Sequence, residues 1–219
     1  MGPWSARQLA ALGAVAATAL LIVGYALLGS PPKFAADSAK IISYFHVHHQ
    51  RVLVAVVLIE IAAALLIALF AQLAVILRDA GSRAEAAVVG IGGAAATGIL
   101  AVGVALYGGL AQLATFGGPD RLSVSSLYRL TQFIQVGWAW MMVAVVSAVA
   151  LAVWRGAHTR AVAAANGVIA MLLVLGGLSV KGVGALAAGT GALSLVATLA
   201  FVAWVLHLAA IFWTRHVNA

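Results

Sequence analysis

Long apolar runs alternate with short polar segments along the chain, and six of these runs are long enough to cross a bilayer. At ~1.5 Å rise per residue, about 20 residues span the ~30 Å hydrocarbon core of a membrane. The run between Arg51 and Arg78 is the clearest, because Glu60 and Gln72 are its only polar residues. The pattern predicts one domain, an all-α bundle of six transmembrane helices, over residues 9–28, 52–77, 85–111, 130–154, 161–180 and 191–213.

The polar segments between the spans are short. The connector at residues 33–50 mixes aromatic and charged residues, which predicts an interfacial helix that runs into the second span. The turn Arg78-DAGS-Arg83 is echoed by Arg155-GAHT-Arg160 further along the chain. The echo predicts a repeated two-helix hairpin with both turns on one membrane face. Independent convergence of tight turns between Ala-rich helices is the alternative.

Composition places the chain in the membrane. Hydrophobic residues make up 65% and charged residues 8%, whereas a soluble domain carries about 25% charged residues. The net charge of +7 comes from single cations at the ends of apolar runs, so we expect no nucleic-acid partner. The chain has no cysteine, which excludes disulfides, thiolate metal sites and iron–sulfur clusters.

The cations also predict an orientation. In a six-span topology, one face carries arginines that lie in very short segments, where the positive-inside rule is strongest: Arg7, Arg78, Arg83, Arg155, Arg160 and Arg215. We therefore expect a multi-pass protein of the bacterial inner membrane with both termini in the cytoplasm. The connector at residues 33–50 then faces outward.

The chain resembles a known family. The segment DSAKIISYFHVHHQRVLVAVVLIEIAAALLIALFAQLAVILRD, with Gly92-Gly93, Trp204 and Arg215, is similar to a large bacterial family of six-span proteins catalogued as a domain of unknown function. The resemblance covers the chain from about Asp37 to Arg215. It implies a six-helix bundle and supplies no activity or catalytic residues.

A histidine cluster precedes the second span. Imidazole is the commonest protein ligand for Zn and Cu, so His46, His48 and His49 are candidate ligands for either metal. His46 and His49 share a face if the connector helix continues into the span. A closed site needs three or four ligands, and Asp37 and Asp120 are the acids on the same predicted face. The alternative is a set of polar residues among lipid headgroups.

A carboxylate lies inside the second span. Glu60 is about 13 Å from Arg51 along the helix and is costly in hydrocarbon unless neutral or paired. We expect Glu60 to point into the bundle, with Lys181, Gln132 or Gln135 as its partner. The functional interpretation is a proton relay or a ligand-binding carboxylate. The structural alternative is a protonated side chain hydrogen-bonded between helices.

The fourth span carries a candidate ligand face. Gln135, Trp138 and Met142 share one face at helical spacing and, with Glu60 and Gln132, form the predicted ligand-binding set. Such a face suits a lipid, a quinone or a pigment tail, and is otherwise a packing seam. His207 in the last span has no intramembrane histidine at its depth, so haem is not expected within one chain.

These patterns carry no motif for catalysis, nucleotide binding or retinal attachment. The leading hypothesis is a non-catalytic accessory or scaffold subunit, not an enzyme, that holds a lipid or apolar cofactor. Its partners are the lipid bilayer and other membrane subunits or a second copy of itself. The alternatives are a metal- or cofactor-dependent redox protein using the histidine cluster, and a small-solute or proton-coupled carrier using Glu60.

Overall fold

The computed structural model describes residues 5–116, 121–155, 160–178 and 192–214. Within these ranges the chain forms seven α-helices: α1 (Ala6–Leu28), α2 (Ser38–Val47), α3 (His49–Asp79), α4 (Arg83–Phe116), α5 (Arg121–Arg155), α6 (Arg160–Gly177) and α7 (Ala192–Thr214). All except α2 are long and apolar enough to cross a membrane. The predicted all-α bundle of six spans is confirmed, and these helices indicate a multi-pass membrane protein.

Local capping sets several helix ends. Ser5 and Gln8 form a capping box at the start of α1, and Gly29, with φ of 66°, ends that helix. Asp37 caps α2 by accepting from the backbone N–H of Lys40 at 2.7 Å. The start predicted for the fourth span is nine residues late, because the polar segment before residue 130 belongs to the same helix α5.

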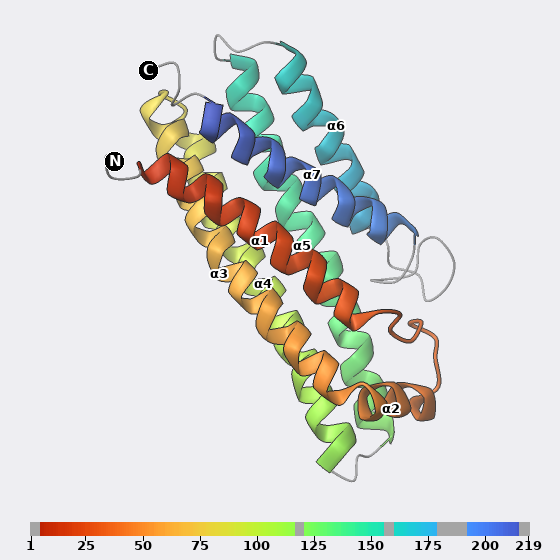
Figure 1. The fold of residues 1–219 in the computed structure, drawn as a ribbon. Coiled ribbons are helices and arrows are strands. Elements are labelled where there is room, and N and C mark those ends of the chain that lie inside the picture. The colour runs from red at the N-terminus through yellow and green to blue at the C-terminus, as the bar shows by residue number, and fades with distance from the viewer. Residues whose placement is uncertain (1–4, 117–120, 156–159, 179–191, 215–219) are drawn as a thin grey trace.

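The connector is not continuous with the second span. α2 ends at Val47, His48 has φ of −102° and ψ of 17°, and α3 begins at His49. The prediction of one helix that runs through the histidines is therefore wrong in this respect. A residue with ψ near zero leaves the regular α-helical path, so α2 and α3 point in different directions (Figure 1).

The six spans form a closed ring in chain order. Each packs against its neighbours in sequence, α1 packs against both α3 and α7, and α2 covers one end by contacts with α3, α4 and α5. Figure 1 shows α2 at one end of the bundle and the start of α1 at the other. We call these the α2 end and the turn end, since the α3–α4 turn lies at the latter.

Glycines allow the helices to approach closely. A Cβ atom on Gly24 of α1 would lie 2.5 Å from Ile59 of α3, and one on Gly93 of α4 would lie 2.4 Å from the Phe70 ring. Phe70 in turn stacks on Trp204 of α7, with ring centroids 6.3 Å apart. Both aromatic side chains are buried, so they fill the interior of the helix bundle at the level of Gly93.

The end of α5 and the start of α6 lie at the same end of the bundle as the α3–α4 turn. Arg83 and Arg160 are the first residues of α4 and α6, two residues and one residue before the predicted starts of these spans. Arg155 of α5 forms an ion pair with Glu85 of α4, which ties the two hairpins together at the turn end. Common ancestry of the hairpins stays a prediction.

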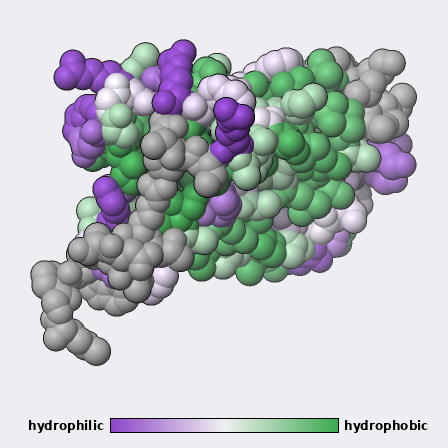
Figure 2. Space-filling model, turned by 90° about the horizontal axis from the view of Figure 1, so that it is seen from above, coloured by the Kyte–Doolittle hydropathy of each residue, from purple (hydrophilic) through white to green (hydrophobic). Residues whose placement is uncertain are grey.

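The outer surface suits lipid. In Figure 2, hydrophobic residues form a broad green area, and hydrophilic residues gather mainly towards the edges of the molecule. Large apolar side chains are exposed along every span, for example Ile22 of α1, Ile91 of α4 and Leu199 of α7. Water would penalise such a surface and hydrocarbon would not.

Candidate functional site

The polar side chains gather at the α2 end. Arg51 of α3 donates from Nε and Nη2 to the Leu27 carbonyl, at 3.0 and 2.7 Å. The Tyr44 hydroxyl of α2 donates to the Leu28 carbonyl at 2.5 Å. These carbonyls belong to the last turn of α1, which has no further helical N–H groups to bond them. Two neighbouring helices therefore cap α1 and fix the position of α2.

The Tyr44 hydroxyl is held in its neutral form. Burial raises the pKa of the Tyr44 phenol to about 12, and the positive charge of Arg51 opposes that rise. A neutral phenol is the form that donates to Leu28, so this cap is intact throughout the ordinary pH range.

A second set of polar side chains lies in the core of the bundle, beneath α2. Gln132 of α5 donates from Nε2 to the Tyr107 hydroxyl of α4 at 2.6 Å. Tyr107 is hydrogen-bonded to Tyr128, and Tyr128 donates to the Pro32 carbonyl of the α1–α2 connector. The Phe45 ring of α2 closes this chain from above, with centroids 5.5 Å from Tyr107 and 6.0 Å from Tyr128.

Only one arrangement of protons satisfies every contact in this chain. Tyr128 uses its proton on the Pro32 carbonyl, so the proton between the two phenols comes from Tyr107. Tyr107 must then accept from the Gln132 amide N–H, in agreement with the assigned amide orientation. Gln132 is fully buried, and its Oε1 has no hydrogen-bond partner within the described part of the chain.

The structure separates the three candidate metal ligands. His46 is exposed on α2, His48 lies between the helices with its ring 5.1 Å from Tyr44, and the His49 ring packs 5.6 Å from Phe116. Among the described residues, no group of three or more His, Cys, Asp or Glu side chains is arranged to hold a metal ion. Zinc or copper binding by these histidines stays a prediction that the described geometry does not favour.

His49 lies beside another polar residue. Val56 of α3 packs against Gly108 of α4, and the antiparallel register of these helices brings His49 opposite Thr115. The Nε2 atom of His49 and the Oγ1 atom of Thr115 are buried, and neither has a hydrogen-bond partner in the described ranges. Two such atoms at one level suit a bridging water.

Glu60 contradicts the expectation that it points into the bundle, because its side chain is exposed on the outer face of α3. The cause is the packing of its neighbours. Ile59 is fully buried against Gly24, and Ala63 is buried one turn later. Successive helical residues differ by about 100° in direction, so the contact made by Ile59 turns Glu60 outward.

The remaining members of the predicted ligand set do not join Glu60. Gln132 bonds to Tyr107, Gln135 is half-buried, and Met142 is fully buried in the core. Trp138 packs edge-on against Phe201 of α7, with centroids 5.0 Å apart. On the predicted ligand face of α5, Gln132 and Trp138 therefore contact other side chains of this chain, as expected for a packing seam. Lys181, a predicted partner of Glu60, lies outside the described residues.

Sequence reasoning missed a further polar contact at the middle of the bundle. Trp204 donates from Nε1 to Asn166 Oδ1 of α6 at 2.7 Å, and both residues are buried. His207, one turn further along α7, has a buried Nε2 atom with no hydrogen-bond partner in the described ranges. The signal for this contact is an asparagine inside an apolar run, since a buried amide requires a partner.

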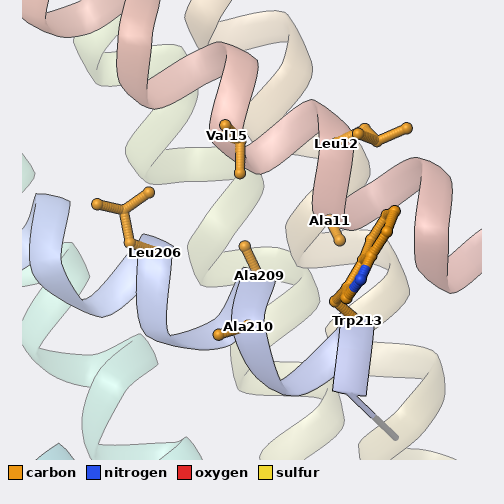
Figure 3. Close-up of a pocket in the computed structure, with 7 residues that line it drawn as sticks. All are labelled: Ala11, Leu12, Val15, Leu206, Ala209, Ala210 and Trp213. Atoms are coloured by element: carbon orange, nitrogen blue, oxygen red, sulfur yellow. The ribbon is translucent and has the colours of Figure 1, made fainter. Parts of the chain in front are cut away.

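Two apolar grooves flank α1 towards the turn end. One, of about 320 Å³, lies between α1 and α7 and is shown in Figure 3, where Trp213 and Leu12 lie at one end and Val15 and Leu206 at the other. The second, of about 400 Å³, lies between α1 and α3 and includes Gln72. Neither contains a residue of the predicted ligand set, and their linings suit lipid chains.

Comparison of the chain with protein-family models, curated proteins and solved structures finds no match. The resemblance to the bacterial six-span family therefore stays a prediction. What the geometry offers chemically is a neutral, hydrogen-bonded core at the α2 end, and one carboxylate, Glu60, that faces away from the bundle.

Proposed function

We propose that the protein is a non-catalytic accessory or scaffold subunit of a membrane complex, and that it binds its partner through the outer face of α3. The exposed position of Glu60 on that face carries the proposal. Glutamate within a membrane span is costly and in membrane proteins almost always faces protein or a water-filled cavity. Among the described residues Glu60 faces neither, so a second protein would supply the missing surroundings.

The interior of the bundle supports the same proposal. Phe70 and Trp204 fill the middle, and the polar groups beneath α2 are largely bonded to one another. The carrier alternative rests on an acid inside the bundle, and Glu60 does not lie there. The redox alternative rests on clustered histidines, which the described residues do not bring together.

The test uses a photoreactive amino acid in the native membrane. Val57 lies one turn before Glu60 and is 54% exposed, and Leu199 on the outer surface of α7 is 58% exposed and serves as the matched control. We expect irradiation to give one discrete adduct with another polypeptide at Val57 and none at Leu199. No adduct at Val57, or the same ladder of products at both positions, would overturn the proposal.

We also propose that the turn end faces the cytoplasm of a bacterial cell. The start of α1, the α3–α4 turn and the ends that Arg155 and Arg160 mark all lie at that end, and their arginines sit in very short segments. The cysteine-free sequence makes the test direct. In Ala80→Cys, a membrane-impermeant thiol reagent should label the protein only after the cells are permeabilised. Labelling of intact cells would reverse the orientation.

A further inference from the structure

The outer face of α3 and α4 around Glu60 points to a particular partner. We propose that the occupant is a transmembrane helix of a different protein that presents a Lys, Arg or His side chain to Glu60. This inference rests on the proposed function and specifies the chemistry of the partner.

Glu60 has no hydrogen bond or ion pair within the described part of the chain. The nearest cation along α3 is Arg51, nine residues away, and its guanidinium is bonded to the Leu27 carbonyl of α1. Lipid tails offer no donor. No described residue of this chain pairs with Glu60 at this depth, which points to a group on another molecule.

The surface beside Glu60 is formed by the neighbouring helix α4. The contacts of Ala74 with Gly90 and of Val56 with Gly108 set the α3–α4 register and bring Glu60 opposite Val104. On α4, three of the exposed residues near this level have small side chains or none, Gly98, Ala105 and Gly109, and the exposed Val102 is larger. A Cβ atom added at Gly98 or Gly109 would meet nothing within 4 Å.

Small residues on an exposed helix face let a second helix approach closely. Beside them, Glu60 is the only acidic side chain on the exposed surface of the spans away from the helix ends, within the described ranges. A helix that packs over Ala105 and Gly109 would bring its own side chains to the Glu60 carboxylate. The close approach supplies van der Waals contact, and the carboxylate selects what the partner carries at that depth.

The charge of Glu60 favours another protein over a second copy of this chain as the occupant. A two-fold interface centred on this face would place Glu60 against its own copy, and two carboxylates repel each other. The described arginines and lysines of this chain lie at or near helix ends, except for Arg129, which is exposed eight residues inside α5. α5 is not among the helices that pack against α3, so a second copy placed on the α3–α4 face about a two-fold axis presents Glu60 there and not Arg129. A different membrane helix readily supplies a cation at this depth.

The test varies the charge of Glu60 while the photoreactive amino acid stays at Val57. We expect Glu60→Asp to retain the adduct, and Glu60→Gln and Glu60→Leu each to reduce its yield by about tenfold, because interhelical polar contacts contribute about 1–2 kcal/mol. Since Glu60 faces outward, all three variants should purify as monodisperse protein with unchanged Tm. The peptide crosslinked at Val57 should come from an apolar segment containing Lys, Arg or His.

Three results would overturn this inference and leave the proposed function standing: an undiminished adduct in Glu60→Gln, an adduct with an apolar segment that lacks a cation, or an adduct with a second copy of this chain. An absence of any specific adduct in the wild-type background would instead overturn the proposed function itself.

Discussion

Replacing Tyr107 by Phe tests whether the hydrogen-bonded chain beneath α2 stabilises the bundle. The hydroxyl accepts from Gln132 and donates to Tyr128, and its loss leaves Gln132 with both ends of its amide unpaired at zero exposure. A buried polar group left unsatisfied costs about 1–3 kcal/mol, and contacts within membranes fall towards the lower end of such ranges. We expect a loss of about 1–2 kcal/mol, or a fall in Tm of about 2–8 °C.

The assay is thermal unfolding in mild detergent, followed by tryptophan fluorescence. Tyr25→Phe is the matched control, because the Tyr25 hydroxyl has no hydrogen bond in the described part of the chain. Gln132→Leu in the Tyr107→Phe background should recover much of the loss, since removal of both partners leaves no orphaned amide. If Tyr107→Phe unfolds at the same temperature as the control, or if Gln132→Leu lowers Tm by a further full amount, the hydrogen-bonded chain does not stabilise the bundle.

Two further predictions concern the packing at Gly93 and the pH dependence of the Tyr44 hydrogen bond. Gly93→Ala should destabilise the protein by about 1–3 kcal/mol, because the new Cβ atom would lie 2.4 Å from the buried Phe70 ring, whereas Gly98→Ala on the same helix should be neutral or stabilising by up to about 1 kcal/mol; equal Tm values for the two variants would contradict this. Folding raises the pKa of Tyr44 from about 10 to about 12, so its contribution to stability is complete below pH 10 and is lost as the pH rises towards 12; denaturant midpoints of the wild type and Tyr44→Phe should converge over that range and nowhere below it.

The sequence predicts the spans well because their length and their flanking charges are local properties. Each predicted span corresponds to a helix, and α4 and α6 begin within two residues of the starts predicted at 85 and 161. The largest boundary error is at α5, which begins at Arg121. Polar residues before position 130 end the apolar run there but not the helix, since hydrophobicity reports membrane depth and not backbone conformation.

The direction of Glu60 could not be obtained from the cost of its charge. That cost favours an interior carboxylate, but the face of α3 that packs is set by its contacts with other helices, such as Ile59 against Gly24. A rotation of α3 by one residue, about 100°, would turn an outward side chain inward. A single sequence does not show which α1 residue contacts which α3 residue. The cost of the Glu60 charge alone therefore predicted the wrong face of α3.

The six-span topology alone predicts that the tyrosines lie at one end of the bundle. The chain has four tyrosines, and Tyr25, Tyr44, Tyr107 and Tyr128 all fall towards the same membrane face in a six-span arrangement. The structure brings Tyr107 and Tyr128 together with Gln132. Their pairing was beyond sequence reasoning, because the bonded residues are far apart along the chain and the register between the helices decides which side chains meet.

Glu60 and Glu85 provide a comparison within one molecule. Glu85 is 8% exposed and paired with Arg155, so the chain supplies a cation where its own packing encloses a carboxylate. Glu60 is exposed and has no such cation in the described ranges. If Glu60 serves an external partner, its removal should matter only in the complex.

The matched variants Glu60→Ala and Glu85→Ala separate these roles in the purified protein. Glu85→Ala should lower stability by about 1 kcal/mol, a modest value because the Arg155 side chain is 67% exposed and its charge is screened by solvent. Glu60→Ala should change the free energy of unfolding by no more than roughly 0.5 kcal/mol, as expected for a surface substitution. In the membrane it should reduce the yield of the photo-adduct at Val57 by about tenfold, as in Glu60→Leu. A loss of stability in Glu60→Ala as large as that in Glu85→Ala would mean that Glu60 holds this bundle together, and the case for an external partner at that position would fail.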